Sequence, residues 1–263
     1  MDKLTNIMLK RNINFSDIEN LAEKIISEKP VKMQIPNKLS SSGGLGVEGA
    51  VLQLLATWYR ASERHIIHTS IQNIQPDSFD DLCNSLFGLC ALRLSDSILL
   101  SGKEEVELST ALQPAIEIFK ELRDERFKSA FKGKYLSLSA FKSSVIHGGK
   151  DREFDSPLYN NDQVVGARKF NQLTLNALDA IEPRSADMSR LVIAHLSEIL
   201  RELFTNTHRH GRTDVDGNPY NKNFRGIIFN SLHLTRSRLD EISMSRSGKL
   251  ALFLADWLPA DNQ

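Results

Sequence analysis

Residues 31–69, VKMQIPNKLSSSGGLGVEGAVLQLLATWYRASERHIIHT, decide the fold class of this chain. The run from Val31 to Ile35 and the run from Arg64 to Thr69 are short and bounded by turn residues, which predicts two strands. Between them, apolar residues recur at helical spacing. These are Val47, Val51, Leu54, Leu55 and Trp58. We therefore expect a βαβ unit within an α/β fold.

The flanking sequence extends this pattern in both directions. Residues 1–29 read as an amphipathic helical lead-in that Pro30 closes, and Ser78 followed by acidic residues predicts a helix N-cap. Further elements are expected as helices at about 78–92, 104–131, 166–182 and 187–210, strands at 135–141 and 224–229, a loop at 147–161 and a mostly helical tail at 232–258.

Composition excludes several classes of function. The 263 residues hold 33 Lys and Arg against 33 Asp and Glu, so no positive field favours a nucleic-acid partner. No apolar run approaches the roughly 20 residues of a membrane span. Cys83 and Cys90, seven residues apart in a predicted helix, are expected on one face as reduced core thiols. A reducing, cytoplasmic setting follows, without membrane association.

Two short motifs have simpler explanations than the ligands they suggest. Residues 44–49, GLGVEG, match the dinucleotide-binding G-x-G-x-x-G, but the preceding predicted strand ends about eight residues too early. A flexible linker and helix start are the better interpretation. Residues 214–218, DVDGN, resemble a calcium loop, yet Gly217 is fourth where an EF-hand needs glycine sixth. His208 and His210, two apart on a helix, cannot face one metal, so we expect a solvated turn.

The predicted helix at 187–210 carries the most informative pattern. Its apolar residues form a stripe that predicts one buried face. The stripe comprises Met188, Leu191, Val192, Leu196, Ile199, Leu200, Leu203 and Phe204. Beside it, Glu198, Glu202, Asn206 and His210 follow at four-residue intervals, so their side chains are expected along one line.

The segment from Arg201 to Gly211, RELFTNTHRHG, resembles the N-box of GHKL ATPases, the superfamily of gyrase, MutL and sensor histidine kinases. It is most similar to the E-x-x-T-N-x-x-R-H-G version of anti-sigma-factor serine kinases. The resemblance implies ATP and Mg²⁺ as cofactors, with Glu202 as catalytic base and Asn206 as a ligand of Mg²⁺. It also implies that Arg209 contacts the phosphates and that His210 lies beside the adenosine or phosphates.

The resemblance shapes the expected organisation. We expect residues 1–165 to form an N-terminal α/β region and residues 166–263 a partial GHKL-like α/β sandwich with a long N-box helix. A GHKL pocket also needs D-x-G-x-G to hold the adenine, and no such motif follows Gly211. Asp256 has no glycine around it. ATPase or kinase-like activity is therefore expected only if the missing motifs are supplied elsewhere.

Three functions remain open from the sequence. The first is an ATP-binding GHKL-type regulatory protein, or a fragment of one, in signalling or in bacterial stress or phage defence. The second is a non-catalytic α/β module that docks a protein partner or forms a homo-oligomer, with an ordinary amphipathic helix capped by Gly211. The third is a phosphoryl hydrolase, because residues 209–213, RHGRT, resemble the R-H-G-x-T of histidine phosphatases; that motif needs a preceding strand, where a helix is predicted here.

Overall fold

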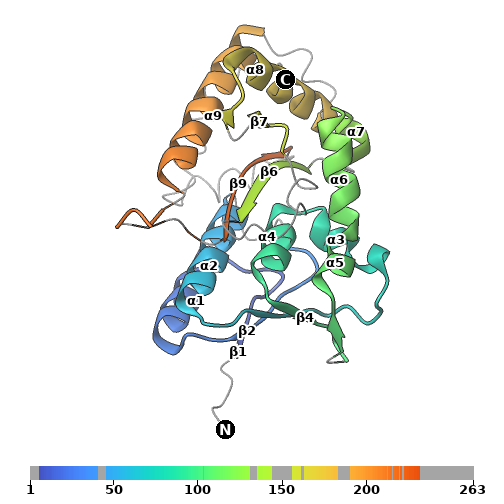
Figure 1. Ribbon diagram of the computed structural model, residues 1–263, viewed down its shortest axis with the longest axis vertical. Coiled ribbons are helices and arrows are strands. Elements are labelled where there is room, and N and C mark those ends of the chain that lie inside the picture. Colours follow the sequence, from blue (N-terminus) through green and yellow to red (C-terminus); the bar gives the residue numbers. More distant parts are fainter. Residues whose placement is uncertain are drawn as a thin grey trace, which may run out of the picture.

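The computed structural model describes residues 6–40, 46–102, 104–130, 135–143, 156–160, 163–182, 190–211, 213–214, 216–218, 220 and 222–231. These residues form an α/β protein, which confirms the predicted fold class. Figure 1 shows a parallel sheet near the N-terminus, helices packed on one side of it, and two longer strands beyond those helices. The predicted tail helix at 232–258 lies outside the described residues. None of the described helices is long and apolar enough to span a bilayer.

The N-terminal sheet has its strands in sequence order, with the first four parallel and the fifth antiparallel. The strands are β1 (Asn6–Met8), β2 (Lys32–Gln34), β3 (Ile66–His68), β4 (Ser97–Leu99) and β5 (Glu105–Val106). The middle residue of each parallel strand is buried, because alternate side chains of a strand point to opposite faces. The β1 strand was not predicted, since residues 1–29 were expected to be helical throughout.

Two helices complete the predicted βαβ pattern. Helix α1 (Phe15–Glu28) begins at a capping box in which Asp17 N donates to Asn14 Oδ1 at 2.9 Å and Asn14 N donates to Asp17 Oδ2 at 3.3 Å. Helix α2 (Val47–Ala61) buries the five apolar residues that predicted it. The buried indole of Trp58 donates to the Pro30 carbonyl at 2.7 Å, which ties α2 to the start of β2. The β2–α2–β3 unit is thus confirmed.

The helix predicted from Ser78 is broken into three pieces. They are the 3₁₀ turn η2 (Pro76–Phe79), α3 (Asp80–Cys83) and α4 (Leu86–Leu94). Ser78 lies inside η2, and the residue that caps α4 is Ser85, whose Oγ accepts from Gly88 N at 3.0 Å. Gly88 is required by close packing, because a Cβ there would lie 2.4 Å from the Leu82 carbonyl oxygen.

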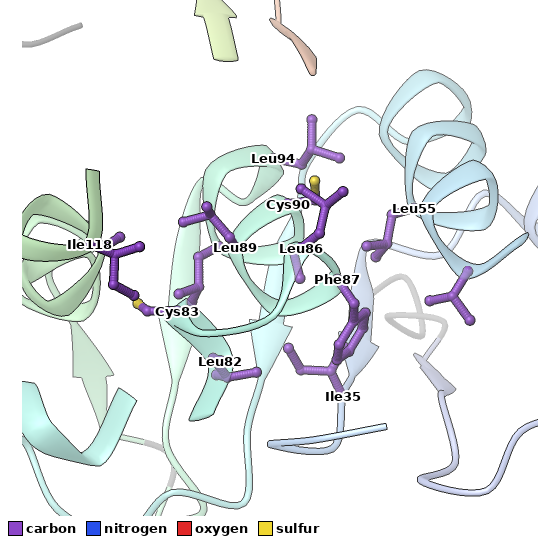
Figure 2. Close-up of a cluster of buried hydrophobic side chains, with 14 of the residues drawn as sticks. Ile35, Leu55, Leu82, Cys83, Leu86, Phe87, Leu89, Cys90, Leu94 and Ile118 are labelled. Atoms are coloured by element: carbon purple, nitrogen blue, oxygen red, sulfur yellow. The ribbon is translucent and has the colours of Figure 1, made fainter. Parts of the chain in front are cut away.

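Helix α4 is the centre of the hydrophobic core, and eight of its nine residues are buried. Figure 2 shows its side chains surrounded by Leu55 of α2, Cys83 of α3, Ile118 of α6 and Ile35, which directly follows β2. Cys83 and Cys90 are free and buried, as expected for core thiols, but they belong to α3 and α4 and not to one helix. Burial raises the pKa of the Cys83 thiol to about 12.

The charged stretch at 104–131 is also less regular than predicted. It contains β5 and three helices rather than one. These helices are α5 (Leu108–Ala111), α6 (Gln113–Arg123) and α7 (Phe127–Ala130). Pro114 lies in the first turn of α6, where a missing N–H costs nothing. Glu125, with φ of 58°, turns the chain between α6 and α7.

The second part of the molecule is built on a long antiparallel pair. Strands β6 (Tyr135–Ser143) and β9 (Lys222–Asn230) pair from Tyr135↔Asn230 to Ser143↔Lys222, and both had been predicted as shorter strands. Between them in sequence come the short hairpin strands β7 (Tyr159–Asn160) and β8 (Gln163–Val164), and the helices α8 (Ala167–Ile181) and α9 (Arg190–His210). The predicted domain boundary at residue 165 therefore falls between two strands that share one sheet.

A half-buried polar cluster joins the two parts. The carboxylate Oε1 of Glu48, in the first turn of α2, accepts hydrogen bonds from Tyr135 Oη at 2.7 Å and from Phe87 N at 3.2 Å. Tyr135 Oη in turn accepts from Leu86 N at 3.0 Å, so α2, α4 and β6 are held together. Burial raises the pKa of Glu48, and its hydrogen bonds only partly oppose that effect.

Candidate functional site

Helix α9 carries the predicted site residues and is fixed by its contacts with α8 and β9. Its buried face is formed by Ile193, Ser197 and Phe204. The Phe204 ring packs 5.6 Å from the Tyr159 ring and 6.4 Å from the Phe170 ring, measured between centroids. One side of the helix is therefore anchored on the sheet and on α8, and the opposite side faces outward.

The apolar stripe predicted for this helix is only partly buried. Leu191, Ile199 and Leu203 are 64%, 58% and 59% exposed, and the half-buried members Val192, Leu196 and Leu200 lie between them and the buried face. Met188 lies outside the described residues. The stripe is wider than the surface that α8 and β9 offer, so its outer half remains on the surface of α9.

The predicted site residues Glu202, Asn206, Arg209 and His210 are all exposed on α9. Their spacing puts Glu202, Asn206 and Arg209 on one side of the helix, pointing away from the buried face, because each step is close to one or two helical turns. Glu202 Oε1 accepts from Arg201 Nη2 at 2.5 Å. The structure thus aligns a carboxylate, an amide and a guanidinium toward solvent.

The C-terminal end of α9 is shaped by Thr207 and Gly211. Thr207 Oγ1 donates back to the carbonyl of Phe204 at 2.7 Å, and Gly211 N donates to the Thr207 carbonyl at 2.9 Å. A Cβ at Gly211 would lie 2.8 Å from that same carbonyl oxygen, which explains the glycine. Because the helix is continuous from Arg190 to His210, residues 204–208 do not form the strand that a histidine phosphatase motif requires.

The calcium-like segment after Gly211 forms a self-contained turn. Asp214 Oδ1 accepts from Asp216 N at 3.0 Å and Asn218 N at 2.8 Å, and Oδ2 accepts from Asn218 Nδ2 at 3.1 Å. These bonds lower the pKa of Asp214, and Gly217 closes the turn with φ of 85°. Both carboxylate oxygens serve the turn itself, as the solvated-turn interpretation predicts.

The sheet-facing side of α9 contains a cluster that the sequence did not predict. Tyr159 Oη and His208 Nδ1 are 3.1 Å apart, and their ring centroids are 5.4 Å apart. The guanidinium carbon of Arg225, a buried residue of β9, lies 5.5 Å from the centroid of the Tyr159 ring. The four-residue spacing of Phe204 and His208 could have placed both on the buried side, but no signal in the sequence pairs them with Tyr159.

Asn206 and Arg209, on the exposed side of α9, are the candidate ligands of Mg²⁺ and a triphosphate. Within the described ranges, no group of three or more His, Cys, Asp or Glu side chains could hold a metal by itself. Mg²⁺ does not require such a group, because it keeps several waters and uses one or two protein oxygens together with phosphate oxygens. Asn206 supplies such an oxygen on an exposed surface, with Arg209 one turn further along. These residues fit the phosphate half of a site.

Residues 46–49, the described part of the GLGVEG segment, form the start of helix α2. Gly46 is the N-cap of α2 with φ of 82°, and the next acidic residue, Glu48, is committed to Tyr135 and to the N-terminus of α4. The described parallel strands run in simple sequence order, so they lack the reversal of strand order at which open α/β sheets bind dinucleotides. The expected helix start is thus present, and the expected linker before Gly46 lies outside the described residues.

Comparison with known proteins adds no relative: no family model, no curated protein and no solved structure matches the chain.

Proposed function

We propose that the outer face of α9 is the phosphate- and metal-binding half of a GHKL-type ATP site in a regulatory protein. The observation that carries this proposal is the alignment of Glu202, Asn206 and Arg209 on the exposed side of a helix whose opposite side is packed on a sheet. The order of elements also supports it, because β9 follows α9 directly and pairs with β6. A role in signalling, stress or phage defence is compatible with such a site.

The chemistry assigns a separate task to each of the three side chains. Bound Mg²⁺ and ATP supply an electrophilic phosphorus and a counter-charge for the phosphates. Asn206 offers a neutral amide oxygen to the metal, and Arg209 holds phosphate charge with a group that does not deprotonate. Glu202 lies one turn from Asn206 and accepts a proton from a water or hydroxyl; its contact with Arg201 orients the carboxylate.

The proposal concerns the binding of Mg-ATP and not its turnover, because the sequence contains no D-x-G-x-G motif to hold the adenine. Affinity then rests on the phosphates and metal, and turnover depends on motifs supplied elsewhere. This makes ATP, ADP and inorganic triphosphate informative ligands. If the phosphates carry the affinity, triphosphate with Mg²⁺ should bind nearly as well as Mg-ATP.

A thermal-shift experiment tests the proposal. At about ten times its dissociation constant, Mg-ATP should stabilise the folded chain by about 1.4 kcal/mol, since a ligand of the native state contributes RT ln(1 + [L]/Kd). That corresponds to roughly 4 °C in Tm for a chain of this size. Asn206→Ala and removal of Mg²⁺ by EDTA should each abolish the rise, whereas Glu202→Gln should keep it.

The matched control is Glu198→Gln, which removes an exposed carboxylate one turn before Glu202 on the same helix. It should leave the thermal shift unchanged. The proposal is refuted if millimolar Mg-ATP does not raise the Tm of the folded wild-type chain. It is also refuted if Glu198→Gln reduces this rise in Tm as much as Asn206→Ala does.

The exposed apolar side chains of α9 favour a second candidate function, docking of a second copy of the chain. Ile199 and Leu203 are more than half exposed on adjacent turns, which is unusual for large side chains on a charged helix. In that case Ile199→Glu with Leu203→Glu should convert a dimer to a monomer in light scattering, and Mg-ATP should have no effect on Tm. A strictly monomeric wild type excludes this candidate.

A further inference from the structure

A hollow of about 440 Å³ lies between the end of α6, the β7–β8 hairpin and the start of α8, away from the outer face of α9. Its volume is within the range of pockets that hold small molecules. The side chains that matter for its chemistry are Arg123, Glu125, Ser156, Tyr159, Asn160 and Lys169. They come from three separate stretches of the chain, so the hollow is a product of the fold.

The charges of the hollow favour an anion. Among the described residues that line the hollow, Arg123 and Lys169 are basic and Glu125 is acidic. Lys169 donates to Glu125 Oε1, and Asn176 Nδ2 donates to Glu125 Oε2 at 3.2 Å, so this carboxylate is held to one side by α8. Helix α8 also begins after the N-cap Gly166 without a side-chain cap and without an acidic residue in its first turn, which adds a partial positive charge.

Part of the described wall is apolar or aromatic and is held in place by hydrogen bonds. Pro157 and the buried Val165 lie beside Tyr159, whose ring is half-buried. The turn that carries Tyr159 is closed by its own N–H donating to the Ser156 carbonyl at 3.1 Å, and Val165 N donates to the Leu158 carbonyl at 3.0 Å. Because the hairpin and the Tyr159–His208 contact hold this wall, binding requires little ordering of the protein.

We propose that this hollow binds a small organic anion, with a flat or apolar body against Tyr159 and an anionic phosphate or carboxylate between Arg123 and Lys169. The site is separate from the proposed phosphate half-site, because Tyr159 contacts α9 through the half-buried His208, whereas Asn206 and Arg209 are exposed. A ligand here also rests against a side chain that anchors α9. The hollow thus assigns a second, independent ligand to the same part of the fold.

Phenyl phosphate is the probe for this proposal, with isothermal titration calorimetry as the assay. Wild type should bind it with a dissociation constant of about 1 mM or lower. Arg123→Ala and Lys169→Ala should each weaken binding by about fivefold or more, because each removes one of two charges near the anion. The matched control is Arg168→Ala, an exposed basic residue of the same helical turn that does not line the hollow.

Glu125→Gln gives a test with the opposite sign. Removing the like charge should strengthen phenyl phosphate binding by about threefold, although Lys169 loses its partner. Benzoate should bind at the same site, and its affinity relative to phenyl phosphate shows which anionic group fits. Neutral phenol should bind at least tenfold more weakly than phenyl phosphate.

Three results would overturn the proposal. They are no binding of either anion at about 10 mM, equal weakening in Arg168→Ala and Lys169→Ala, or tighter binding of phenol than of the anions. Asn206→Ala should leave phenyl phosphate binding unchanged, and Arg123→Ala should leave the Mg-ATP thermal shift unchanged. The two proposals can therefore fail independently.

Discussion

Tyr135→Phe should destabilise the protein strongly although it removes a single oxygen atom. The Tyr135 hydroxyl donates to the half-buried Glu48 carboxylate at 2.7 Å and accepts from Leu86 N at 3.0 Å, at the start of α4. A bond to a charged group contributes about 1.5 kcal/mol at the low end, which applies because Glu48 is partly solvated. An N–H left without its acceptor costs at least about 1 kcal/mol. We therefore expect a loss of about 2.5 kcal/mol in the free energy of unfolding.

Urea unfolding followed by circular dichroism measures this loss directly. The matched control is Tyr220→Phe, which keeps the ring that lies 4.1 Å from the guanidinium carbon of Arg60 and should cost less than about 0.5 kcal/mol. In a Glu48→Gln background, Tyr135→Phe should cost about 1 kcal/mol less than in wild type, because the bond to charge is already gone. A cost below about 0.5 kcal/mol in wild type, or one equal to that of Tyr220→Phe, refutes the role of this cluster in joining α2, α4 and β6.

Two further predictions concern the same core. Gly88→Ala should lower the free energy of unfolding by about 3 kcal/mol or prevent folding, because the new Cβ would lie 2.4 Å from the Leu82 carbonyl oxygen. Gly49→Ala, with nothing within 4 Å of the new Cβ, should stabilise α2 by about 0.5 kcal/mol. Equal Tm values for the two variants would contradict this prediction. For Glu48, the pKa is raised from 4.5 in the folded state, so below that pH the carboxyl is protonated in both states and its burial costs nothing. As the pH rises above 4.5 the unfolded chain ionises first, and stability falls until the folded pKa is passed. In urea titrations Glu48→Gln should therefore gain stability relative to wild type as the pH is raised above 4.5, and a gap independent of pH would argue against this burial effect.

Elements with long, regular patterns could be predicted from the sequence, and those set by tertiary contacts could not. Helix α8 and strands β6 and β9 lie where their periodicity indicated. Strand β1 is only three residues long among charged residues, and its pairing with β2 stabilises it more than any local preference. The break between α3 and α4 depends on Ser85 capping the second helix, which competes with helical continuation.

The site could be predicted in part for the same reason. Spacing alone predicts Glu198, Glu202, Asn206 and His210 along one line, and all four residues are exposed on α9. Which half of the apolar stripe is buried depends on how α8 and β9 meet the helix, and no local pattern contains that information. The contact of Tyr159 with His208 joins residues 49 positions apart through a hairpin, so it emerges only from the folded chain.

The long β6–β9 ladder also has a consequence for the order in which the chain folds. Neighbouring parallel strands are connected by short segments that contain one or more helices, so each pair closes a short loop. In the β6–β9 ladder the paired residues that are closest in sequence are 143 and 222. Closing so large a loop costs entropy before any pairing repays it, so the N-terminal sheet should form first and β6 should wait for β9. During synthesis β6 leaves the ribosome long before its partner, and a chain that stops before Lys222 would keep it as an open strand edge prone to aggregation.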